Sequence, residues 1–220
     1  MITVQSVDTW ANAERGTRAR RLLVRPARMG DAEAIARIYN QAIVARTSTF
    51  ETEPRTARQI EMLLAEGGTT YPAIVVERAG HVVGWASSSP HSSRACFACI
   101  AEFSVYVDRA SRATGVGRAA LEALVTECER RGFWKLLSRV FPENVASRVL
   151  CRALGFREVG VLHCHAPVDG TWRDAIIVEK LLGEARLAYD RAGRGEAAAS
   201  VTARNLRAVR KRGLSLTAPA

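Results

Sequence analysis

The chain has 220 residues, of which 48% are hydrophobic, and this is enough for one domain with a substantial core. No apolar run reaches the roughly 18 residues that a membrane-spanning helix needs, and the N-terminus has no secretory signal, so we expect a cytoplasmic protein without a membrane partner. The five cysteines are an odd number without the spacing of a disulfide-rich scaffold, which favours free thiols.

The formal net charge of +10 comes largely from the two ends of the chain. Arginines gather in residues 15–28 and in residues 186–212, and apart from Tyr189 these runs lack the aromatic side chains that stack on nucleic-acid bases. We therefore expect solvated tails and no nucleic-acid partner. The predicted division is a flexible N-terminal extension at 1–21, one domain at 22–182 and a basic C-terminal tail at 183–220, helical or disordered.

The N-terminal part of the domain predicts a strand followed by two helices. The β-like segment Leu22–Arg25 comes first, and Asp31 is then a good N-cap for a helix. Apolar residues recur behind it at helical spacing; they are Ile35, Ile38, Ala42 and Ile43. Thr56-x-x-Gln59 has the pattern of a capping box, which predicts a second helix that ends at Gly67-Gly68.

The rest of the domain alternates between hairpins and helices. In chain order we expect strands at Ala73–Glu77, Val82–Ser87 and Ala98–Val107, a helix at Gly117–Arg131, a strand at Trp134–Val140, a helix at Glu143–Leu154, and strands at Phe156–His165 and Thr171–Leu182. The turn Asp169-Gly170 joins the last two strands. This order predicts a mixed α/β fold rather than the even alternation of a doubly wound nucleotide-binding sheet.

A glycine turn, Arg112-x-x-Gly115-x-Gly117, lies between a predicted strand and a predicted helix. The N-terminus of a helix presents unpaired N–H groups and a partial positive charge, which together bind phosphate well. The turn lacks the Gly-Lys-Ser/Thr of a Walker motif and the third glycine of a dinucleotide-binding motif. A pyrophosphate cradle and a purely structural helix start both fit these residues.

This turn, taken with Asn144-x-x-Ser147 and Leu150-Cys151-x-x-Leu154-Gly155-Phe156, resembles the GNAT family of acyl-CoA N-acetyltransferases. The resemblance covers about residues 22–182. It implies the GNAT fold, a mixed, mostly antiparallel central sheet with helices on both faces, and acetyl-CoA as cosubstrate without a metal. Carried over residue by residue, the cofactor site would comprise Val105, Val107, Arg112, Gly115, Gly117, Arg118 and Asn144.

A narrower resemblance is to the phosphinothricin and arsinothricin N-acetyltransferases, which acetylate the α-amine of toxic glutamate analogues. It rests on TFETEP at 49–54, AEFSVYV at 101–107 and GTWRD at 170–174. It implies antibiotic or herbicide resistance, a small amino-acid substrate and a homodimer. The implied substrate residues are Phe50, Arg94, Ser104, Trp172 and Arg173. Two departures leave the acceptor open: Arg173 replaces a usual histidine, and Phe97 a usual tyrosine.

Glu102 is the candidate general base, because it interrupts an apolar strand that leads into the glycine turn, and burial makes a carboxylate a better proton acceptor. The alternative is a structural ion pair with an arginine such as Arg94. We expect backbone N–H groups at a strand irregularity near Val105 to stabilise the oxyanion. Cys151 is the candidate general acid, with a small core residue as its alternative.

Arg94 and Arg173 suit a substrate carboxylate and a phosphinate or arsinate group, because the guanidinium fork pairs with such oxyanions. Two alternative functions stay open. One is an acetyltransferase for another amine, such as methionine sulfone, a peptide N-terminus or a polyamine; the other is a non-catalytic acyl-CoA or nucleic-acid-binding module. Cys96-x-x-Cys99 and His163-Cys164-His165 are weak metal signals, so we expect no metal.

Overall fold

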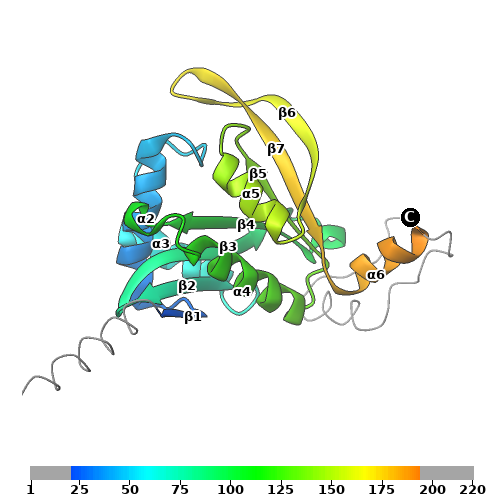
Figure 1. Ribbon diagram of the computed structural model, residues 1–220, viewed down its shortest axis with the longest axis horizontal. Helices are drawn as coiled ribbons and strands as arrows, with labels where there is room; N and C mark the ends of the chain where they lie inside the picture. Colours follow the sequence, from blue (N-terminus) through cyan, green and yellow to red (C-terminus); the bar gives the residue numbers. More distant parts are fainter. Residues whose placement is uncertain (1–20, 194–220) are drawn as a thin grey trace, which may run out of the picture.

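A computed structural model describes residues 21–193 as a seven-stranded sheet with helices on both faces (Figure 1). The strand order is β1-β2-β3-β4-β5-β7-β6, and every neighbouring pair is antiparallel except β4 and β5. The prediction of a mixed, mostly antiparallel sheet is therefore confirmed. Within residues 21–193, no helix is both long and apolar enough to cross a membrane.

The strands are β1 Leu22–Pro26, β2 Ala73–Arg78, β3 His81–Pro90, β4 Ile100–Val107, β5 Lys135–Val140, β6 Arg157–Val168 and β7 Thr171–Leu181. The helices are α2 Ala32–Ala45, α3 Ala57–Gly67, α4 Val116–Arg130, α5 Val145–Ala153 and α6 Gly183–Ala192, with short 3-10 turns η1 Met29–Asp31, η2 Ala95–Phe97 and η3 Arg109–Ser111. The predicted strands and helices of the domain are confirmed, with ends within about three residues of those expected. The expectations for residues 1–20 and 194–220 lie outside the described residues.

Two apolar cores hold the sheet between its helices. Side chains alternate along β2, so that Ile74 and Val76 pack with α4 and α5 while Val75 packs with α2 and α3. Leu121 and Leu124 of α4 are completely buried in the first core. The sheet therefore has an α4/α5 face and an α2/α3 face, and every strand side chain can be assigned to one of them.

The parallel strands β4 and β5 stay together over only three residues. Residues 100–102 of β4 pair with residues 135–137 of β5, and the last pair is Glu102 with Leu137. Beyond it, β4 continues beside β3 to Val107, and β5 continues beside β7 to Val140. The backbone pairing therefore ends between two strands that are each paired on their other side. We call this point, after Glu102 and Leu137, the β4/β5 parting.

Glycines seat the first turn of α4 against β3 and β4. A Cβ atom on Gly84 of β3 would lie 2.4 Å from Cγ1 of Val116, so only glycine lets the helix approach this closely. A Cβ atom on Gly117 would lie 3.3 Å from Cγ2 of Val107. The N-terminus of α4 is thus fixed beside the end of β4.

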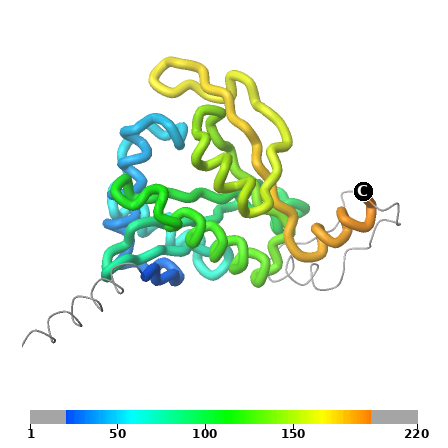
Figure 2. Tube along the Cα trace, in the orientation of Figure 1, coloured from blue at the N-terminus to red at the C-terminus, as the bar shows by residue number. Residues whose placement is uncertain are grey.

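The β6–β7 hairpin extends beyond the rest of the sheet (Figures 1 and 2). Its edge strand β6 loses register with β7 twice, between Glu158 and Gly160 and again between Leu162 and Ala166. Near the hairpin turn, Asp169 accepts a hydrogen bond of 2.7 Å from Nε of Arg46, the residue that ends α2. The hairpin tip is therefore tied to the start of the loop that carries Phe50.

Candidate active site

Glu102 and Ser104 lie on the α2/α3 face of β4. Their Cα partners on β3 are Ser89 and Ser87, so four polar side chains form a patch on this face of the sheet. Glu102 is also the last residue of β4 that pairs with β5. The predicted base therefore stands at the β4/β5 parting and is accessible from the α2/α3 side, with 27% of its side chain exposed.

Two side chains contact the same oxygen of Glu102. Nη1 of Arg139, on β5, donates to Oε1 at 2.6 Å, and Nδ1 of His91 lies 3.4 Å from that atom. Within residues 21–193, Oε2 has no hydrogen-bond partner. The expected ion pair is therefore present, but with Arg139 rather than with Arg94.

The aromatic ring of Phe97 lies between Arg94 and His91. Its guanidinium carbon is 5.6 Å from the centre of the Phe97 ring, and the Phe97 ring is 6.3 Å from the ring of His91. This sequence of contacts places Arg94 near Glu102 without touching it. The phenylalanine that departs from the family pattern serves as a platform for the arginine.

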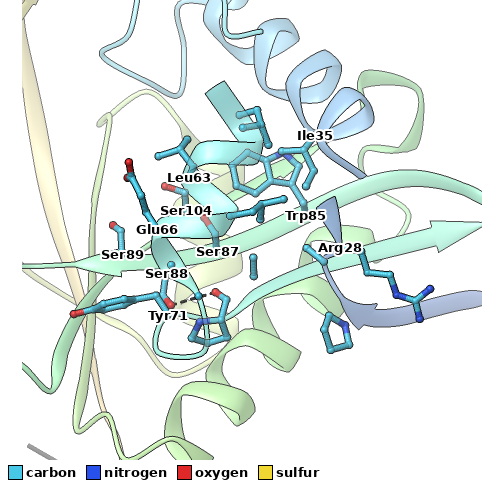
Figure 3. Close-up of a pocket in the computed structure, with 18 of the residues that line it drawn as sticks. Arg28, Ile35, Leu63, Glu66, Tyr71, Trp85, Ser87, Ser88, Ser89 and Ser104 are labelled. Carbon is cyan, nitrogen blue, oxygen red and sulfur yellow. Dashed lines mark hydrogen bonds between the residues drawn. The ribbon is translucent and has the colours of Figure 1, made fainter. Parts of the chain in front are cut away.

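A cavity of about 810 Å³ lies on the same face of the sheet (Figure 3), and Ser89 and Ser104, the neighbours of Glu102 on that face, are among its lining residues. The serines Ser87, Ser89 and Ser104 line it from the sheet, and Leu63 of α3 lines it from above. Trp85 also lines it, and 93% of this residue is buried. This volume suits a small molecule, and the mixture of apolar and hydroxyl groups is typical of a ligand pocket.

Three predicted substrate residues lie on the loop after α2 and on the β6–β7 hairpin; they are Phe50, Trp172 and Arg173. Phe50 packs edge-on against Phe141, just after β5, at 4.6 Å between ring centres. Arg173 of β7 donates to Glu143 at 2.8 Å, so its guanidinium already has a carboxylate partner. Trp172 is 63% exposed on the hairpin. The structure thus brings Phe50 to the end of β5 but leaves Trp172 in solvent.

The glycine turn opens α4 with free space in front of it. Gly115 is the N-cap, with φ +84°, and a Cβ atom there would meet nothing within 4 Å. No described side chain caps this helix, and its first turn contains no acidic residue. Arg112 and Arg118 flank the turn and are exposed. The turn therefore presents backbone donors and positive charge to an anion.

Beyond Glu102, β4 has a backbone edge on the side that β5 has left. The N–H of Asp108 donates to the carbonyl of Val83 on β3 at 2.9 Å. Because backbone groups alternate along a strand, Val105 and Val107 direct theirs away from β3, toward the side that β5 has left. The strand irregularity expected near Val105 is not found, since β4 keeps one register with β3 throughout. The parting, not a bulge, exposes these groups.

The other two predicted residues lie in α5. Asn144 is its N-cap and accepts a hydrogen bond of 3.1 Å from the N–H of Ser147. Cys151 is 98% buried in the α4/α5 core. Burial, assisted by the negative charge of Glu158, raises the pKa of the Cys151 thiol to about 12. A thiol this weakly acidic is a poor proton donor to a departing thiolate, whose pKa is ordinarily about 8.5, so the core role is favoured over the predicted acid.

Comparison with known proteins agrees with this architecture. The model of the acetyltransferase (GNAT) domain family matches residues 21–157. The chain belongs to the GNAT acetyltransferase family. It is 31% identical over 169 residues to the L-methionine sulfoximine/L-methionine sulfone acetyltransferase of Salmonella typhimurium, covering 74% of this chain and 96% of that one.

Two further GNAT proteins are similar over most of the domain. The phosphinothricin N-acetyltransferase of Streptomyces viridochromogenes is 30% identical, over 69% of this chain and 82% of its own length. The phosphinothricin acetyltransferase of Sinorhizobium meliloti, solved in complex with AcCoA, superimposes with a TM-score of 0.72 at 26% identity, over 83% of this chain and 94% of that one. The relation to the phosphinothricin group is therefore shown.

Sequence reasoning missed His91 and Arg139, the two residues that contact Glu102. Arg139 could have been found from the crossover pattern. Parallel neighbours place Leu137 opposite Glu102, and the residue two positions later then shares its face. For His91 no comparable signal exists, since it reaches Glu102 from the irregular segment after β3.

The thiols provide a test of the burial of Cys151. Iodoacetamide at pH 8 should label the exposed Cys96 and Cys164 and leave Cys151 unmodified, because the thiolate is the reactive form and burial raises the pKa of this thiol to about 12. Labelling of Cys151 should increase only as the pH approaches that value. Mass spectrometry of the peptides measures this, with guanidinium-unfolded protein as the control. Equal labelling of Cys151 and Cys96 in the folded protein would contradict the assigned environment.

Proposed function

We propose that this protein transfers the acetyl group of acetyl-CoA to the α-amine of a small amino acid, with Glu102 as the general base. The observation that carries the proposal is the position of Glu102. It lies at the β4/β5 parting, next to the cavity-lining Ser89 and Ser104, with one carboxylate oxygen free of described partners. The acceptors named for the relatives support amino acids of the phosphinothricin or methionine sulfone type, and the family resemblance adds arsinothricin.

The cofactor side of the proposal uses the α4/α5 face. The open turn at Gly115 fits the pyrophosphate of coenzyme A, with Arg112 and Arg118 nearby and Gly117 keeping the helix close to β4. The backbone groups of Val105 and Val107 suit the pantetheine arm. The Asn144 amide N–H group suits a further contact, since its oxygen already caps α5.

The reaction follows from this arrangement. An α-ammonium group must lose a proton before its nitrogen can attack the thioester carbonyl, and Oε2 of Glu102 accepts that proton. The amine then forms the new C–N bond and loses its second proton, the C–S bond breaks, and coenzyme A leaves as a thiolate that takes up a proton. Phe50 and Ser104 line the acceptor's position, with Arg94, Trp172 and Arg173 at its border. Cys151 supports the fold of α5 and donates no proton.

Gly115 and Gly80 form a matched pair that tests whether the glycine turn binds the pyrophosphate. Gly115 and Gly80 have φ values of +84° and +83°, and a Cβ atom on either would meet nothing within 4 Å. Gly115→Ala and Gly80→Ala should therefore lose similar stability, about 1–2 kcal/mol each. Only Gly115→Ala should weaken acetyl-CoA binding, by about tenfold or more, because its methyl group occupies the anion's position. Calorimetric titration measures this, and equal affinity in both variants would remove the turn from the cofactor site.

The acceptor is tested by following release of free coenzyme A. Phosphinothricin, arsinothricin, methionine sulfone, glutamate and spermidine are the acceptors to compare. We expect turnover with one or more of the first three, and a loss of kcat of about 10²–10⁴-fold in Glu102→Gln, which keeps the shape but not the base. Acetyl-CoA binding by this variant is the control for folding. A Glu102→Gln enzyme with near-normal kcat would exclude Glu102 as the base.

We further propose that the protein is cytoplasmic and that it is a homodimer, the second as the family resemblance implies. Exposed apolar side chains on α5 and β6 support a second copy as partner; they are Val145, Val149, Val159 and Val161. Light scattering should give twice the chain mass of 24.0 kDa. A particle of single mass at micromolar concentration would overturn the dimer and leave the acetyl transfer unaffected.

A further inference from the structure

Arg139 makes the shorter of the two contacts to Glu102. It lies on β5 two residues beyond Leu137, the last β5 residue that pairs with β4. Residues two apart on a strand share a face, so Arg139 is on the same side of the sheet as Glu102. Its Nη1 donates to Oε1 of Glu102 at 2.6 Å. The guanidinium therefore spans the β4/β5 parting on the side from which an acceptor enters.

Breaking the contact between Arg139 and Glu102 costs little free energy. The side chains of Arg139 and Glu102 are 35% and 27% exposed, and a single N–H joins them. Ion pairs with this degree of exposure contribute little to stability. A guanidinium carries five N–H donors, so most of those on Arg139 remain for another partner. A second carboxylate can therefore take the place of Glu102.

Within residues 21–193, Arg139 is the arginine that hydrogen-bonds Glu102. Arg94 stacks on Phe97, and Arg173 donates to Glu143. An α-amino acid carries its amine and its carboxylate on one carbon atom. An amine positioned at Glu102 therefore brings its own carboxylate within reach of Arg139.

We propose that Arg139 binds the α-carboxylate of the acceptor, passing from Glu102 to the substrate and thereby freeing Glu102 to accept the ammonium proton. This inference rests on the proposed function and adds to it the residue that selects free α-amino acids over other amines. Peptide N-termini and polyamines lack a carboxylate at this position. With such amines Arg139 stays on Glu102, and its positive charge makes the carboxylate a weaker base toward the incoming ammonium group.

The experiment compares one amino acid with its own carboxamide. L-Methionine sulfone or L-phosphinothricin, whichever is acetylated faster, and the matching α-carboxamide are assayed with the wild-type protein, Arg139→Gln, Arg139→Lys and Arg186→Gln. Arg186 is an exposed arginine paired with Asp190 on α6, so its variant controls for loss of a surface charge. Comparison of variants with the same acceptor cancels differences in amine basicity. Calorimetric titration of the amino acid into coenzyme A-loaded enzyme gives a readout independent of turnover.

We expect Arg139→Gln to lower kcat/KM for the amino acid by about 30-fold, mainly through KM, because a charged hydrogen-bond partner of the carboxylate is lost. Its kcat/KM for the carboxamide should stay level or rise, since Glu102 is then free at all times. Arg139→Lys should restore part of the loss, as it keeps the charge without the fork. Arg186→Gln should match the wild type with both acceptors.

Equal losses with both acceptors would reduce Arg139 to a structural support of Glu102 and overturn the inference while the proposed function stands. An unchanged KM and unchanged amino-acid binding in Arg139→Gln would overturn it as well. A wild-type protein that binds acetyl-CoA but acetylates no amino acid would overturn the inference together with the proposed function. These three results are distinguishable because the wild-type rate and the ratio between acceptors are measured separately.

Discussion

The separation of β4 from β5 after three paired residues is the constraint on which the rest of the molecule depends. Each strand stays paired on its other side, β4 with β3 and β5 with β7. The two strands can therefore separate from each other while both remain part of the sheet. One face of the opening carries Glu102 and the cavity, and the other carries the first turn of α4. A donor and an acceptor can therefore meet from opposite faces of one sheet.

The sequence predicted those parts of the fold that local chemistry determines. The capping box of α3 is present in full, with Thr56 and Gln59 satisfying each other's backbone N–H at 3.3 and 2.8 Å. Gly115 has the left-handed backbone conformation that its place at a helix start suggested. Asp169-Gly170 forms the predicted turn. In each case a few neighbouring residues contain the whole signal.

The contacts of the candidate site were less predictable because they join distant segments. Glu102 meets Arg139 across 37 positions of sequence, and only the neighbourhood of β4 and β5 makes that contact possible. The environment of Cys151 likewise depends on how α5 packs beside α4, which the helical pattern alone does not determine. The loss of register in β6 is a third example, where Cys164 adopts φ +48° and its N–H turns to Asp174. The sequence motifs thus indicated which residues belong to the candidate site, but tertiary contacts decide what each residue there can do.

The two margins of the sheet have a consequence for association. β1 is only five residues long and ends at Pro26, which has no N–H to donate, and β6 is interrupted by two losses of register. Neither margin offers a long straight row of backbone donors and acceptors to a foreign strand. Growth of the sheet from molecule to molecule, the first step of edge-to-edge aggregation, is therefore disfavoured. Within residues 21–193, side-chain surfaces rather than strand edges therefore offer the better contact for a second copy, which favours specific and limited assembly.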